Sequence, residues 1–139
     1  MGDAIDSGAA PKPVGAYPHA RRVGDLLLLS GLGPRVPGSN EIPGNEYDQT
    51  GRLVAWDIEA QTRQLVENLE EVLTASGAGL GDLVDVTVFL TDMERDFATF
   101  NRVYAEIFSD IRPCRTTVEV GALPTPIAVE FKCIAWLGD

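Results

Sequence analysis

Two β-branched and aromatic runs near the end of the chain limit the possible folds more than any other feature. They cover residues 113–120 and 127–136, alternate with period two, and are bounded by prolines. We interpret them as two strands of one sheet, arranged as a near-hairpin. Each carries a charge in a setting suited to a packed sheet, Arg115 in the first and Glu130 in the second. A charge at such a place needs a partner or a function.

Hydrophobic periodicity predicts two helices in the rest of the chain. One is expected from a cap at Asp57 to about Ser76, because apolar residues recur there on one helical face and Gly77 follows. The second follows an expected cap at Asp96 and buries an aromatic face that ends at Phe108. Further strands are predicted at residues 20–23, 26–30, 52–54 and 83–91.

Two segments have no periodicity of their own. Residues 1–14 are small, polar and proline-containing, and we expect a flexible N-terminal arm there. The stretch from Gly31 to Gly51 is rich in glycine and proline, which predicts a long irregular loop. A loop of that length in a compact domain is usually functional or part of an interface.

This order of elements predicts an α+β fold, a two-layer sandwich of a sheet of about six strands with two helices on one face. The other face would keep Phe89, Thr87 and Thr117 together with parts of the 26–30 strand. That surface is too apolar to remain in water. We therefore expect a homo-oligomer that buries it.

Composition excludes several classes of function. The 139 residues form one domain, and the formal net charge of -10 makes a general nucleic-acid binder a poor hypothesis. The chain has no apolar run long enough to span a membrane, and we expect a cytoplasmic protein. Two cysteines, Cys114 and Cys133, and one histidine provide neither a disulfide framework nor a metal-finger spacing.

Arg115 and Glu130 are the main candidates for chemistry. Arginine presents a planar donor fork that matches a carboxylate, and a partly buried glutamate has the raised pKa of a general acid or base. The structural alternative is a salt bridge of Arg115 with Glu119 or with Glu130 itself. Charge placement alone favours that alternative for Arg115.

Four other residues could take part, and each has a structural alternative. Asn101 lies on an aromatic helix face and could present its amide to a ligand or cap backbone. Tyr17 could line a pocket or simply pack, and His19 could act as a base, although a lone histidine near a terminus is more often on the surface. Cys114 next to Arg115 could be reactive, but no base is evident.

Several blocks resemble the RidA/YjgF family of enamine/imine deaminases, and the resemblance covers nearly everything after residue 14. The most specific block is Pro-x-Arg-(Ser/Thr)-x-Val-Glu-Val, followed by a glutamate fifteen positions after its arginine, which Glu130 satisfies. The other blocks are residues 15–17, 29–31, 61–69, 85–93 and 97–101.

The resemblance implies a chorismate-mutase-like homotrimer in which the sheets form a central barrel, with active sites between subunits. Residues 15–139 would then be a RidA-like deaminase domain. Arg115 would hold the substrate carboxylate and Glu130 would position or activate water, while Tyr17, Gly31 and Asn101 would line the pocket. The family requires no metal and no organic cofactor.

Residues 15–19 and 21–25, together with the long glycine- and proline-rich loop that contains Arg35, resemble the branch of 2-aminomuconate deaminases. The sequence also departs from the common family pattern in two places. Residues 30–32 read Ser-Gly-Leu where Ser-Gly-Gln is usual, and the loop over residues 33–56 is long. A dicarboxylate substrate would want a second cation, and Arg35, or alternatively His19, could supply it. That branch converts 2-aminomuconate to 4-oxalocrotonate and ammonia.

Two other functions remain open at this point. A general deaminase of 2-aminoacrylate and related enamines would use the same site, and only substrate size would differ. A small-carboxylate-binding or interaction protein would use Arg115 without turnover. An RNA-cleaving role conflicts with the negative charge and with the absence of a paired histidine.

Overall fold

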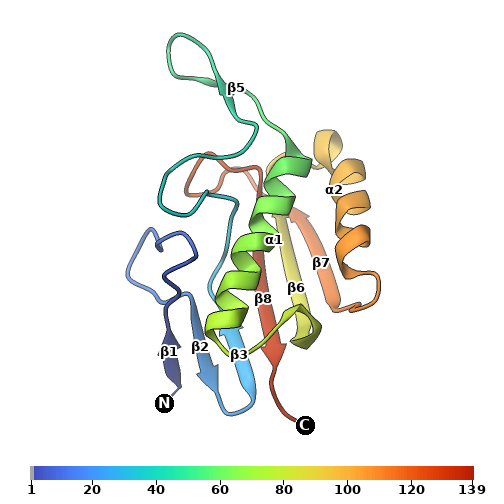
Figure 1. The fold of residues 1–139 in the computed structure, drawn as a ribbon. Coiled ribbons are helices and arrows are strands. Elements are labelled where there is room, and N and C mark those ends of the chain that lie inside the picture. Colours follow the sequence, from blue (N-terminus) through green and yellow to red (C-terminus); the bar gives the residue numbers. More distant parts are fainter. Residues whose placement is uncertain (1) are drawn as a thin grey trace.

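One mixed sheet and two helices make up the body of the molecule in the computed structural model, which describes residues 2–139. The six strands lie in the order β1-β2-β3-β8-β6-β7, and α1 and α2 cover one face (Figure 1). The elements are β1 (Asp3–Ile5), β2 (Ala20–Val23), β3 (Leu26–Leu29), β4 (Glu46–Tyr47), β5 (Leu53–Ala55), α1 (Ile58–Ala75), the 3-10 turn η1 (Leu80–Asp82), β6 (Leu83–Leu90), α2 (Met93–Phe108), β7 (Cys114–Glu119) and β8 (Val129–Trp136). The predicted α+β two-layer sandwich is confirmed.

The core lies between the sheet and the helices. The side chain of Asp57 caps α1 by accepting a hydrogen bond from the backbone N–H of Ala60, as predicted. The cap of α2 is Asp92, which accepts from Arg95 N–H, so the predicted cap at Asp96 is wrong. Asp96 lies inside the first turn, where it is buried and accepts a hydrogen bond from the indole N–H of Trp56.

The two C-terminal strands are not neighbours, so the predicted near-hairpin is wrong. Strand β6 lies between them, antiparallel to β8 and parallel to β7. The reason is that α2 carries the chain from β6 to β7 as a crossover, which makes a parallel pair, and β6 still has a free edge for β8. Arg115 and Glu130 are therefore on strands separated by β6.

The N-terminal segment packs against the sheet instead of forming a loose arm. β1 pairs antiparallel with β2 and adds the sixth strand, and Ser7 and Ala10 are buried. His19 holds this segment because its Nδ1 accepts a hydrogen bond from Ser7 N–H and its Nε2 donates to the carbonyl of Pro11. Sequence patterns did not predict this anchor, because it depends on contacts of His19 with Ser7 and Pro11 that leave no local periodicity.

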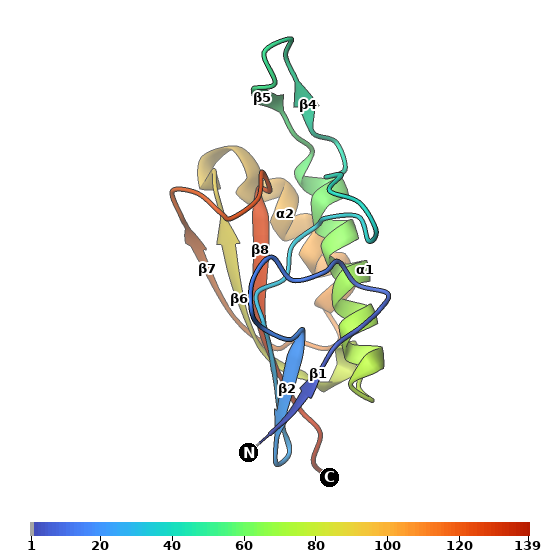
Figure 2. The same cartoon turned by 90° about the vertical axis from the view of Figure 1, so that its left-hand side faces the viewer.

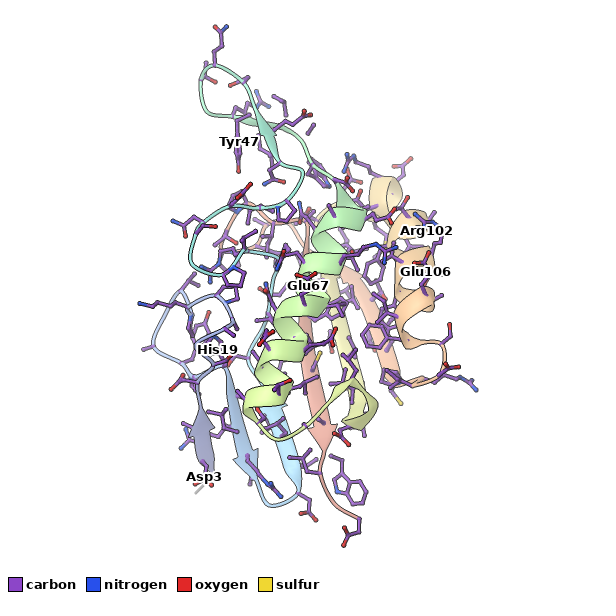
Figure 3. The ribbon with its side chains drawn as sticks, viewed as in Figure 1. Asp3, His19, Tyr47, Glu67, Arg102 and Glu106 are labelled. Carbon is purple, nitrogen blue, oxygen red and sulfur yellow. The ribbon has the colours of Figure 1, made fainter. Side chains whose placement is uncertain are left out.

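The long loop after β3 contains a two-stranded ribbon of β4 and β5, which projects from the body at the end of the sheet where α1 begins (Figure 2). The short strand expected near residues 52–54 is β5, and it pairs with β4 instead of joining the main sheet. The hydroxyl of Tyr47 on this ribbon accepts a hydrogen bond from Asn45 at its base (Figure 3). The loop is thus partly structured.

Both helices lie on the same side of the sheet. No helix or strand of residues 2–139 lies over the other side, here called the open face (Figure 2). Its strand positions include the exposed apolar residues Val23, Leu26, Val118 and Trp136. No helix among residues 2–139 is long and apolar enough to cross a membrane.

Candidate functional site

Arg115 lies on the helix side of the sheet, at the edge strand β7. Its guanidinium carbon is 4.7 Å from the ring centre of Tyr104 and 5.9 Å from those of Phe97 and Phe100, all on α2. These aromatic faces attract a cation and shield one side of it from water. These rings therefore fix the position of the guanidinium, which keeps N–H donors for a ligand.

Asn101 also holds Arg115 from α2. Its Oδ1 accepts a hydrogen bond of 2.8 Å from Nη1 of Arg115. The alternative salt bridges of Arg115 do not form among the described residues, because Glu119 instead accepts a hydrogen bond from the N–H of Met93 at the start of α2. We call Arg115, Asn101 and the three rings the Arg115 half-site.

A groove of about 610 Å³ opens next to this half-site. It runs between the first turns of α2 and strand β7, and it is lined by Met93, Glu94, Phe97, Ala98, Arg115 and Thr117. A planar donor fork at the wall of an apolar groove suits the carboxylate end of a small organic acid.

Glu130 lies on the open face of the sheet. Its neighbours Val129 and Phe131 are fully buried in the core, so alternation along β8 directs Glu130 to the opposite side. The side chain is half-buried, and burial raises the pKa of its carboxyl above the usual range. A raised pKa makes this carboxyl a better proton donor near neutral pH.

Gly31 packs directly against Glu130. A Cβ atom at position 31 would come within 2.8 Å of Oε2 of Glu130, so only glycine lets the backbone approach this closely. Gly31 also lines a small cavity together with Tyr17, His19 and Arg35. We call Glu130, Gly31, Tyr17 and Arg35 the Glu130 half-site.

Tyr17 and Arg35 are held by backbone groups of the N-terminal segment. The hydroxyl of Tyr17 accepts a hydrogen bond from Val14 N–H, and Arg35 donates one to the carbonyl of Lys12. Arg35 lines both the small cavity near Gly31 and a second cavity of about 400 Å³ that also includes Lys12. Its role as the second cation for a dicarboxylate substrate stays a prediction.

His19 does not fit that role, and the expectation that it lies on the surface is wrong. Both ring nitrogens are used in hydrogen bonds to the N-terminal segment, and the side chain is buried (Figure 3). Because Nδ1 accepts from a backbone N–H, the ring is the neutral tautomer with its proton on Nε2. It is a structural residue.

Within one chain the two half-sites stay apart. Arg115 is on the helix side of β7, and Glu130 is on the open face of β8, with β6 between the strands. The structure places Gly31 against Glu130, and Tyr17, Gly31 and Arg35 around one small cavity. It also brings Asn101 and Arg115 together, but it does not join this pair to the Glu130 half-site.

Sequence reasoning missed two residues that support the Glu130 half-site. Gln61 and Asn68 are polar, yet they lie on the buried face of α1 and are 0% and 1% exposed. The signal was present, because both fall on the helical face that carries Leu65 and Leu69.

Among residues 2–139, no group of three or more histidine, cysteine, aspartate or glutamate side chains is placed to bind a metal ion.

Comparison with known proteins finds relatives that match nearly the whole chain. A family model described as Endoribonuclease L-PSP matches residues 7–137. A RutC family protein from Pyrococcus horikoshii is 40% identical over 136 residues, which cover 98% of each chain. The chloroplastic Reactive Intermediate Deaminase A of Arabidopsis thaliana is 35% identical over 135 residues, covering 97% of this chain and 66% of that protein.

Solved structures show the same fold. The crystal structure of Escherichia coli TdcF with bound serine superposes with a TM-score of 0.83 at 32% identity, covering 98% of this chain and 99% of that one. The YjgF gene product of E. coli superposes with a TM-score of 0.81, also at 32% identity, with coverage of 96% and 98%.

Proposed function

Because the chain belongs to the RidA/YjgF family, we propose that it is a hydrolytic deaminase of enamine and imine carboxylates. Two observations carry the proposal. Arg115 has a fixed seat in a groove, as a carboxylate anchor needs, and Glu130 has a raised pKa, as a proton shuttle needs. The relative named Reactive Intermediate Deaminase A, and TdcF with its bound amino acid, support the same reading.

The proposed site forms between two copies of the chain. Arg115 is on the edge strand and Glu130 is on an apolar open face, so a second copy that covers this face brings one half-site against the other. A homotrimer, with the sheets forming a central barrel, satisfies both requirements. It also removes the exposed apolar residues of the open face from water.

The reaction needs only proton transfers and one water molecule. Arg115 holds the carboxylate, and protonated Glu130 gives its proton to the carbon of the enamine, which becomes an iminium ion. Water adds to the iminium carbon and returns a proton to Glu130. The resulting carbinolamine passes its hydroxyl proton to the nitrogen, the carbon–nitrogen bond breaks, and a keto acid and ammonia leave. Substrate plus water equals keto acid plus ammonia.

Within this class, we propose 2-aminomuconate as the substrate and 4-oxalocrotonate as the product. The supporting observation is Arg35, which lies beside Gly31 and can meet a second carboxylate while Arg115 of the neighbouring copy holds the first. A general deaminase of 2-aminoacrylate and related enamines is the alternative, because that substrate has no second carboxylate and would not use Arg35.

The endoribonuclease in the family description has less support here. The net charge of -10 repels a phosphate backbone, and both ring nitrogens of the single histidine are bonded within the chain. A carboxylate substrate meets the same overall field, but it needs only the local cations Arg115 and Arg35.

The decisive assay measures ammonia release from enzymatically generated 2-aminomuconate and, in parallel, from 2-aminoacrylate. Rapid turnover of the dicarboxylate supports the narrower proposal, and turnover of 2-aminoacrylate alone leaves the general deaminase. If neither substrate were turned over, the result would favour a non-catalytic carboxylate-binding protein. Arg35→Met should raise KM for the dicarboxylate only, with Arg52→Met as a charge-matched control on the ribbon.

A mixing experiment tests the shared site. Arg115→Ala and Glu130→Gln are each expected to be inactive alone. When the two variants are unfolded, mixed in equal amounts and refolded together, about a quarter of the sites should regain both groups. No recovery on mixing would contradict a site built from two copies.

A further inference from the structure

Two side-chain amides on α1 are fully buried at positions where apolar side chains would pack as well. Gln61 and Asn68 lie seven residues apart, which places them on the same face of the helix, two turns apart. A buried amide must find hydrogen-bond partners, and it costs stability where an apolar side chain would not. Their partners therefore indicate what they do.

Asn68 holds the loop that follows β3. Its Nδ2 donates hydrogen bonds of 2.9 Å to the carbonyl of Gly33 and 2.8 Å to the carbonyl of Arg35. Its Oδ1 accepts one from Gln64, which fixes the orientation of the amide. The loop runs alongside α1 (Figure 1). Asn68 therefore holds the backbone at Gly33 and Arg35, just after Gly31.

Gln61 holds the segment that leads into β8. Its Oε1 accepts a hydrogen bond of 2.8 Å from Ala128 N–H, two residues before Glu130, and its Nε2 donates to Oδ1 of Asn45. Asn45 in turn donates to the carbonyl of Pro126. The start of β8 is thus tied to the same helix as the loop that carries Gly31.

We propose that Asn68 and Gln61 are positioning residues, through which α1 sets the spacing between Glu130 and the Gly31–Arg35 loop. This inference rests on the proposed role of Glu130 in proton transfer. Neither amide touches the reacting atoms. They act by holding two loop segments, far apart in the sequence, against each other.

The spacing they control is tight, so small movements matter. Gly31 leaves no room for even a Cβ atom beside Oε2 of Glu130. If the loop moved outward, water would reach the carboxylate and reduce the burial that raises its pKa. A displacement of about 1 Å at a proton donor is enough to cost about a hundredfold in rate.

The charged groups near Glu130 are not the cause of its raised pKa. Lys132 follows two positions along β8 on the same face, and Asp85 is on that face of β6. Phe89 on β6 is the residue paired with Glu130, and Gly31 in the loop lies against the carboxyl of Glu130. Burial is the cause of the raised pKa of Glu130. Hydration of the carboxyl is therefore the measurable consequence of a looser loop.

The test is a carbon-13 NMR titration of Glu130 in the assembled protein labelled at glutamate carboxyls, with the signal assigned by its loss in Glu130→Gln. In Asn68→Leu the pKa of Glu130 should fall toward its ordinary range. With a substrate that the wild type turns over, kcat should fall about tenfold to a hundredfold with little change in KM, because the Arg115 half-site is intact.

Thr62→Val is the matched control. Thr62 is as deeply buried on the same helix, but its hydroxyl donates only to the carbonyl of Ile58 within α1. This variant should lose stability without changing the pKa of Glu130 or kcat. Equal effects of Thr62→Val and Asn68→Leu would reduce the role of Asn68 to stability and overturn the proposal.

Gln61→Leu provides a second test if Asn68→Leu folds poorly. It removes the oxygen that accepts from Ala128 N–H, so it breaks the link between α1 and the start of β8. A folded variant with an unchanged pKa of Glu130 and unchanged kcat would also overturn the proposal. The titration needs no turnover, so a protein inactive on every enamine would refute the proposed function without deciding this inference.

Discussion

The Arg115 half-site and the Glu130 half-site are built in different ways. Every group that holds Arg115 is on α2, whose C-terminal end lies a few residues before β7 in the sequence. Glu130 depends instead on Gly31, about a hundred residues away, and on amides of α1 that join the two segments. The first half-site is local, and the second depends on the whole fold.

This difference has consequences for mutation. A local site should tolerate changes elsewhere in the chain, because its seat is made by neighbours on one helix. A site that depends on distant segments should be sensitive to substitutions that touch no substrate. Variants of the two half-sites can test this contrast.

Arg115→Ala should produce the largest loss. It removes a bidentate, charge-assisted anchor, worth about 4–5 kcal/mol, so kcat/KM should fall about a thousandfold to a few thousandfold. The fold should remain, because Arg115 is at a sheet edge. Steady-state kinetics and circular dichroism check both points, with Arg52→Ala on the ribbon as the control. Full activity of Arg115→Ala would remove Arg115 from the site.

Gly31→Ala should come next, and it tests the sensitivity of the Glu130 half-site. The added methyl group would have to displace Oε2 of Glu130, which lies 2.8 Å from the ideal Cβ position. We expect kcat to fall about a hundredfold. Gly121→Ala is the control, since a Cβ there meets nothing within 4 Å. Equal activity of the two variants would show that Glu130 moves without cost.

Asn101→Leu should have a smaller effect on the Arg115 half-site. It removes the hydrogen bond to Nη1, but the three aromatic rings still hold the guanidinium. KM should rise about tenfold, which corresponds to about 1.4 kcal/mol, and kcat should change little. A fall in kcat at unchanged KM would instead indicate that Asn101 acts in the chemical step.

The smallest effect expected is on the pH dependence of stability. Burial raises the pKa of Glu130 in the folded state, so protonated Glu130 is favoured by folding. Its contribution is fully present below the pKa of the unfolded state and is lost as the pH rises through the folded-state pKa. Relative to the wild type, Glu130→Gln should therefore gain stability over that rise, as thermal unfolding at a series of pH values can measure. A constant difference would contradict the raised pKa.

Much of the fold could be predicted because it follows from periodicity. The faces of α1 and α2, the turn between β2 and β3, and strand β6 each depend on residues that are close in the sequence. The pairing of β7 with β6, and the packing of the N-terminal segment around His19, could not be predicted. They depend on which edges remain free after the helices cross the sheet.

Local sequence patterns are enough to show which residue types are available for chemistry and which segments become helices and strands. Arg115 and Glu130 were identifiable because a charge in an apolar strand costs free energy and so needs a reason. In contrast, it takes the folded molecule to show that the two charges face opposite sides of one sheet, and that buried amides on α1 bond to the segments beside Glu130. The physical reason is that strand order and loop packing are set by contacts between segments far apart in the chain, which local patterns do not record.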